Sequence, residues 1–148
     1  MALTKARAVK FVRASNLELP AKNEAVWKGG IACWDTSTGL VAKGFASTTL
    51  IPIGTYAEDR EAVASGTVLV NLFREINAVW MPNAGGGDAV VAADLGGLAY
   101  LADDNTVQNN DATNTLSVFG RIWKLDSTKG VLVEPMDTAG QRTVSGLD

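Results

Sequence analysis

The chain has 148 residues, of which 47% are apolar and 20% are charged, and its net charge is −3. This length and apolar content support one ordinary domain or two very small ones, and abundant glycine with little charge favours short strands and tight turns over long helices. The absence of histidine excludes Ser-His and Cys-His nucleophiles and the commonest zinc ligand. The single cysteine, Cys33, excludes an intrachain disulfide and is expected to fill space in the core.

Positive and negative charges are distributed unevenly along the chain, with the positive ones concentrated near the N-terminus. Four cations precede Glu18, the first acidic residue, so residues 1–17 carry +4 and the remainder carries −7. We predict that residues 1–20 form an extended arm that contacts a partner through these cations and through apolar anchors between them. The residues predicted to make this contact are Lys5, Arg7, Val9, Lys10, Phe11, Val12 and Arg13. The alternative is a solvated tail without a function.

An internal repeat follows the arm when the sequence is aligned with itself at an offset of roughly 65 residues. The matched blocks are Gly29–Cys33 with Gly96–Tyr100, Thr49–Gly54 with Thr115–Gly120, and Gly66–Val70 with Gly130–Val133. Each half, about 25–81 and 88–135, therefore predicts a meander of short strands joined by polar turns. Because such halves are too small to hold good cores alone, we expect a single all-β domain over residues 21–148, packed as a β-sandwich or a barrel-like body.

Four glycines recur at the ends of the predicted strands, in equivalent places of the two halves. They are Gly30, Gly54, Gly97 and Gly120. We expect each to provide either a positive φ or a close approach of two backbones.

The tryptophans divide into two groups. Trp27, Trp34 and Trp123 lie beside predicted strands and are expected to pack in the core. Trp80 lies next to the glycine-rich run Pro82–Asp88, which separates the halves, and has no partner in the repeat. We therefore predict that Trp80 is a contact residue.

Candidate chemistry is sparse. Asp35, Asp59, Glu61 and Asp88 could contribute to a glycosidase-like carboxylate pair, but each is more simply a turn or surface acid. The oxygen-rich run Asp103–Asp111 lacks the order of a calcium-binding loop. We predict no enzymatic activity, no cofactor and no metal. The acidic body also argues against nucleic acid as a partner, and no apolar run is long enough to cross a membrane.

The repeated strands resemble those of the head decoration proteins of tailed bacteriophages. The resemblance rests on Gly29–Val41, with its Gly-Gly-Ile-Ala-Cys-Trp-Asp run, on Ile51–Ala57, and on the Val-rich strand Gly66–Leu72. It implies a structural virion protein that is assembled in the host cytoplasm, binds the outside of the capsid and bridges subunits of the major capsid protein. It also implies self-association, as a homotrimer. The alternative is a host-surface or carbohydrate-binding module on a virion, using Trp80 and the glycine loop.

Overall fold

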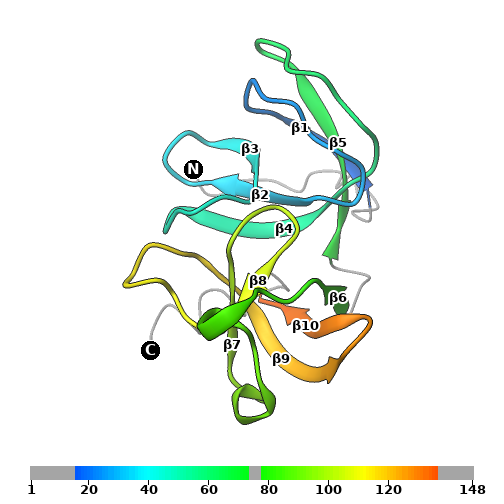
Figure 1. Ribbon diagram of the computed structural model, residues 1–148. Helices are drawn as coiled ribbons and strands as arrows, with labels where there is room; N and C mark the ends of the chain where they lie inside the picture. Colours follow the sequence, from blue (N-terminus) through cyan, green and yellow to red (C-terminus); the bar gives the residue numbers. More distant parts are fainter. Residues whose placement is uncertain (1–15, 74–77, 137–148) are drawn as a thin grey trace, which may run out of the picture.

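The computed structural model describes residues 16–73 and 78–136, and in these residues the chain is all-β, as predicted (Figure 1). The first sheet contains β1 (Asn16–Pro20), β2 (Ile31–Asp35), β3 (Leu40–Lys43), β4 (Leu50–Tyr56) and β5 (Thr67–Leu72). The second contains β6 (Val79–Met81), β7 (Leu98–Leu101), β8 (Val107–Gln108), β9 (Val118–Asp126) and β10 (Gly130–Pro135). Two short 3₁₀ turns, η2 (Gly86–Asp88) and η3 (Ala92–Asp94), lie between β6 and β7.

The two sheets have the same strand order. The first runs β1-β5-β4-β2-β3 and the second β6-β10-β9-β7-β8, so each strand of the second sheet occupies the place of its counterpart in the first. In each sheet a parallel bridge joins a residue just after one edge strand to the other edge strand. Ala21, after β1, pairs with Val41 of β3, and Asn83, after β6, pairs with Val107 of β8. Each sheet is therefore curled into a barrel-like module. We call residues 16–73 the first module and residues 78–136 the second module.

Strand β1 corrects the predicted boundary of the N-terminal arm. It pairs with β5 along its whole length, from Asn16 opposite Asn71 to Pro20 opposite Thr67. Its side chains alternate between exposed and half-buried, and Leu19 packs against the core of the first module. Residues 16–20 thus belong to the chain's own sheet, and the arm can comprise at most residues 1–15, which lie outside the described residues.

A core confined to the first module lies inside its curled sheet. It consists of Ala21, Val26, Ala32, Val41, Ile53, Tyr56, Val68 and Val70. A second and larger cluster, which we call the shared core, joins Ile31, Cys33, Leu50 and Phe73 to residues of the second module. The rings of Phe73 and Phe119 meet there edge to face, with their centroids 5.8 Å apart.

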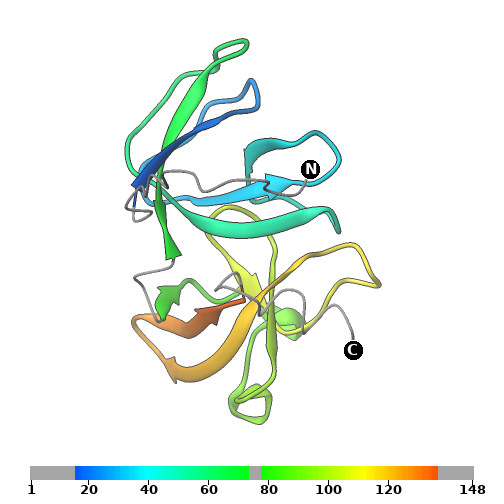
Figure 2. The same ribbon diagram turned by 180° about the vertical axis from the view of Figure 1, so that it is seen from behind.

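Hydrogen bonds also cross between the modules. The buried hydroxyl of Ser117 donates to the carbonyl of Ser47 and accepts from the amide of Leu50 at 3.2 Å, and the amide of Ile31 donates to the carbonyl of Asp104 at 2.7 Å. Strands β2 and β4 lie on the side of the first module that faces the second (Figures 1 and 2). The two modules consequently form one body.

Gly54 and Gly120 occupy equivalent positions where two strands approach closely. A Cβ at Gly54 would collide with the carbonyl oxygen of Asn71, and a Cβ at Gly120 with that of Glu134. Each glycine also lies beside a shift in strand register. For Gly54 the shift is in the pairing of β4 with β2, and for Gly120 it is in the pairing of β9 with β7. The expected close approach is present at both positions.

We predict that Gly54→Ala and Gly120→Ala each lower the free energy of unfolding by about 2 kcal/mol or more, because the added methyl group forces adjacent strands apart. Gly85→Ala is the matched control, since Gly85 has a φ of −100° and nothing within 4 Å of its Cβ position. Its effect should stay below about 0.5 kcal/mol. Urea unfolding followed by circular dichroism measures all three, and equal stability of Gly54→Ala and the parent would contradict this account.

Candidate functional site

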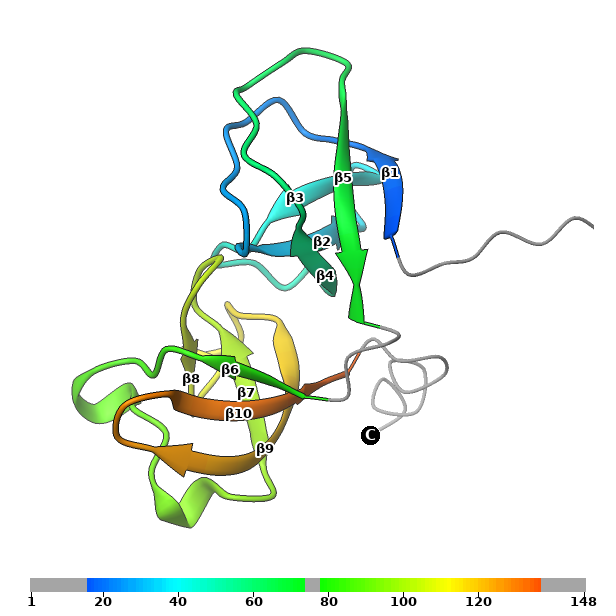
Figure 3. The same cartoon turned by 90° about the vertical axis from the view of Figure 1, so that its right-hand side faces the viewer.

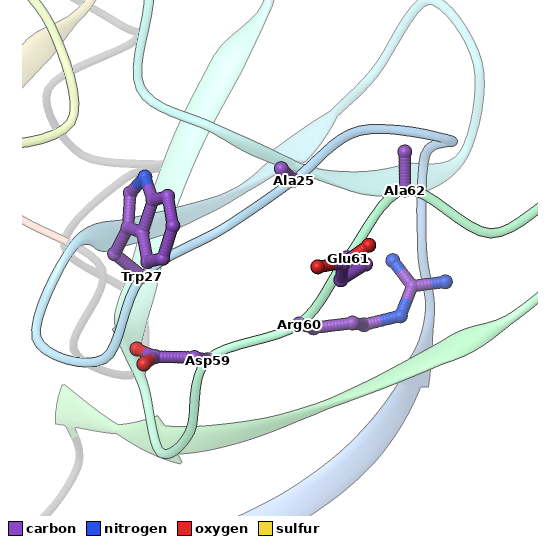
Figure 4. A pocket seen from close by; sticks show the side chains of 6 residues that line it. All are labelled: Ala25, Trp27, Asp59, Arg60, Glu61 and Ala62. Atoms are coloured by element: carbon purple, nitrogen blue, oxygen red, sulfur yellow. The ribbon is translucent and has the colours of Figure 1, made fainter.

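An open groove on the first module is the candidate site (Figure 4). Its volume is about 500 Å³. It is lined by Ala25, Trp27, Asp59, Arg60, Glu61 and Ala62. The indole of Trp27 lies at one end and the side chain of Arg60 at the other, with the carboxylates of Asp59 and Glu61 along the groove (Figure 4).

Two segments far apart in the sequence form the groove, and one backbone bridge joins them. Val26 and Arg60 exchange both main-chain hydrogen bonds, at 2.9 and 3.0 Å. Val26 is buried in the first core, and its neighbours Ala25 and Trp27 therefore point outward, as alternation along an extended segment requires. The bridge thereby places an indole beside the residues that follow β4.

The turn after Trp27 is fixed by further hydrogen bonds. The amide of Lys28 donates to Oδ1 of Asp59 at 2.8 Å, and the amide of Gly30 donates to the carbonyl of Trp27 at 3.0 Å. Gly29 has a φ of +88°, a conformation that other residues rarely adopt, and its amide donates to the carbonyl of Tyr56 at 2.9 Å. The backbone that carries the indole is thus held on both sides.

Arg60 is held over a glycine. Its Nη2 donates to the carbonyl of Val63 at 3.2 Å, and a Cβ at Gly66 would occupy the place of that nitrogen. Its Nη1 is buried and has no hydrogen-bond partner in residues 16–73 and 78–136. Leaving a buried donor without an acceptor costs about 1–3 kcal/mol, so this guanidinium is positioned at some expense of stability.

The groove combines an apolar face with hydrogen-bonding groups of both kinds. The indole of Trp27 is 63% exposed, and Asp59 and Glu61 are exposed. Two carboxylates and one guanidinium line the same groove, so acceptors and a donor group lie along it. Such an arrangement can bind a ligand that has both an apolar face and polar substituents.

The tryptophans differ from the predictions. Trp34 is half-buried and packs against the first core, but Trp27 and Trp123 are 63% and 52% exposed, so their assignment to the core was wrong. Trp123 lies at a bulge in β9, between Ile122 and Lys124, which pair with consecutive residues of β10. Its indole nitrogen donates to Oε2 of Glu134 at 3.0 Å on the outside of the sheet.

Of the predicted contact residues, Trp80 is the one that lies among the described residues, and it does not line the groove. Lys5, Arg7, Val9, Lys10, Phe11, Val12 and Arg13 lie outside the described residues. Trp80 lies on β6 in the second module and is half-buried, with Nζ of Lys129 at 5.4 Å from the centre of its ring. A contact role for these residues stays a prediction.

The groove was missed, because the residues that form it have no clear sequence signal. Ala25, Val26 and Trp27 are all apolar, so the structure shows that Val26 points inward and its neighbours outward, but the residue pattern does not. The pairing of this segment with Arg60 could not be found either, because the two lie 34 positions apart and outside the matched blocks.

The other candidate carboxylates are engaged in local structure. Oδ1 of Asp35 accepts from the hydroxyl of Ser37 at 2.6 Å, from the amide of Ser37 and from the hydroxyl of Thr49. The Ser37 hydroxyl above all holds the pKa of Asp35 below its ordinary value, against the opposing effect of burial. Oδ1 of Asp88 accepts from the side-chain nitrogen Nδ2 of Asn110 at 2.9 Å. Of the four candidate acids, Asp59 and Glu61 are the two that line the groove.

Comparisons with known proteins assign no family. No family model matches the chain, and no curated protein and no solved structure matches it. Within the described residues, no helix is long and apolar enough to cross a membrane, and no group of three or more acidic or cysteine side chains could hold a metal ion. The function therefore has to be inferred from the chain's own residues.

We predict that Trp27→Ala and Trp123→Ala each change the free energy of unfolding by less than about 1 kcal/mol, because exposed side chains contribute little to stability. Trp34→Ala should cost about 2 kcal/mol or more, since Trp34 packs against the first core. Urea unfolding followed by far-ultraviolet circular dichroism distinguishes them. A loss for Trp27→Ala as large as that for Trp34→Ala would show that Trp27 is structural.

Proposed function

We propose that this protein is a non-enzymatic structural component of a virion that binds the outside of the assembled capsid. It stabilises the shell by bridging subunits of the major capsid protein, and it associates with its own copies as a homotrimer. The sequence resemblance to phage head decoration proteins suggests this role. The main structural support for this proposal is that the basic N-terminal segment is directly attached to an edge strand of a single body.

Strand β1 provides this attachment. It is the first strand in the order of its sheet, and the basic residues end at Arg13, three positions before it begins. Five residue pairs join it to β5, and the side chains of Asn16 and Asn71 are hydrogen-bonded at 3.2 Å. A partner that holds residues 1–15 would therefore be connected to the body through a strand rather than through a loose linker.

The charge of the chain favours contact through this segment. The described residues contain seven lysines and arginines against thirteen aspartates and glutamates, whereas residues 1–15 contain four cations and no acid. An acidic surface on a coat subunit or on a sister copy attracts the segment, while the acidic body remains soluble. Extended apolar residues between the cations can add main-chain pairing along a partner's sheet edge.

The single body suits a bridging role. The shared core and the hydrogen bonds of Ser117 join the modules, so a force applied to one is transmitted to the other. A protein that reinforces a shell from outside must resist deformation between its contact points. Two modules with a flexible joint would do this less well.

We predict that deletion of residues 2–14 leaves the melting temperature nearly unchanged but reduces binding to assembled shells at least tenfold, because the deleted residues precede β1. Co-sedimentation with purified shells that lack the protein measures the binding. Unassembled coat protein is the control for shell specificity. Unchanged occupancy after the deletion would contradict the role of the segment and move the contact to another surface, such as Trp80 and the glycine loop.

A matched pair of charge variants separates specific contact from general electrostatics. One variant replaces Lys5, Arg7 and Lys10 by Gln, and the other replaces Lys28, Lys43 and Lys124 by Gln. Both remove three positive charges, so a loss of shell binding that depended on net charge alone would be equal in the two. The proposal expects a strong loss in the first and a small one in the second. Equal losses would contradict it.

A further inference from the structure

We propose that the groove around Trp27 is a binding site for neutral carbohydrate. This function is separate from shell binding and uses residues that the N-terminal segment does not include. The observations are an exposed indole that the fold does not require, polar groups of both kinds in the same groove, and a groove of suitable size.

The fold does not require an indole at this position. The second module contains the same turn, in which the amide of Gly97 donates to the carbonyl of Asp94 at 2.9 Å and the amide of Gly96 donates to that of Ile122 at 2.8 Å. Gly96 has a φ of +84°, close to the +88° of Gly29. Asp94 thus stands where Trp27 stands, and the turn forms with either residue. The fold therefore leaves this position open to a side chain that contacts a ligand, and its indole is 63% exposed.

The polar groups fit a polyol better than an ion. A pyranose ring presents C–H groups that stack on an indole, and hydroxyls that both donate and accept. Asp59 and Glu61 can accept from such hydroxyls, and Arg60 lies at the other end of the groove (Figure 4). An anionic ligand would meet two carboxylates, and a cationic ligand would meet a guanidinium. A neutral ligand avoids both repulsions.

The size and location of the groove agree with this ligand. About 500 Å³ falls within the range of roughly 300–1,000 Å³ that small-ligand sites occupy. The β4–β5 connection, which supplies Asp59, Arg60, Glu61 and Ala62, begins at the end of β4 and extends to the end of the first module away from the second module (Figures 1 and 3). Arg60 reaches Gly66, beside the Pro20 end of β1, whereas residues 1–15 join at the Asn16 end. The Arg60 end of the groove and residues 1–15 thus adjoin opposite ends of β1.

The test uses the full chain and a panel of neutral hexasaccharides, namely cellohexaose, laminarihexaose, maltohexaose and chitohexaose, with binding measured by isothermal titration calorimetry. At least one of them should bind, and Trp27→Ala should weaken that binding at least about tenfold. Trp123→Ala is the matched control, because Trp123 is also exposed but does not line the groove. It should leave the affinity within about twofold of the parent.

Three results would overturn the proposal. The first is the absence of binding for every hexasaccharide at about 10 mM. The second is binding that survives Trp27→Ala. The third concerns a synthetic peptide of residues 1–15. If the chain binds this peptide but none of the sugars, and Trp27→Ala abolishes peptide binding, the groove is a site for a basic segment. Binding of Trp27→Ala to shells is measured in parallel, and loss of shell binding in this variant would also overturn the separation of the two functions.

Discussion

The shared core is the constraint on which the rest of the structure depends. Each module has fewer than 60 described residues, a size at which a chain buries too little apolar surface for much stability. The contact of Phe73 with Phe119, and the packing of Ile31, Cys33 and Leu50 against the second module, remove one face of β2 and β4 from water. Because these strands also belong to the curled first sheet, the shared core holds that sheet in shape and with it the segments that carry Trp27 and Arg60.

Much of the fold follows from local sequence. The matched blocks fall on β2 and β7, on β4 and β9, and on β5 and β10, because alternation of apolar residues and glycine-containing turns are local signals. Gly54 and Gly120 were found by the same comparison, since a close approach of two strands excludes every other residue. These features do not depend on which residues meet over long distances.

The remaining features depend on long-range pairing or on irregular backbone. Strands β1 and β6 hold equivalent places, but their sequences, Asn-Leu-Glu-Leu-Pro and Val-Trp-Met, share no pattern that an alignment could detect. Trp123 lies at a bulge that the sequence does not reveal. The groove depends on the bridge between Val26 and Arg60, and nothing in either segment predicts the other. The candidate site was therefore the part least accessible from sequence.

Duplication offers a physical explanation of how so short a chain could serve the two proposed functions. Equivalent turns of the two modules are fixed by the same main-chain hydrogen bonds, so the side chain at the turn is free to differ, and it is tryptophan in one module and aspartate in the other. One module can thus carry a ligand groove while both maintain the common body. The proposed contact with a shell uses the N-terminal segment, which joins β1 at Asn16 and shares no residue with the groove.

The most direct test of shell binding is a cryo-electron microscopy reconstruction of capsids with and without the protein added. The account predicts additional density on the outer surface, at symmetry-related positions, large enough for the two-module body, with a connection from its β1 edge to a coat subunit. Shells that are identical with and without the protein, or density on the inner surface, would contradict it.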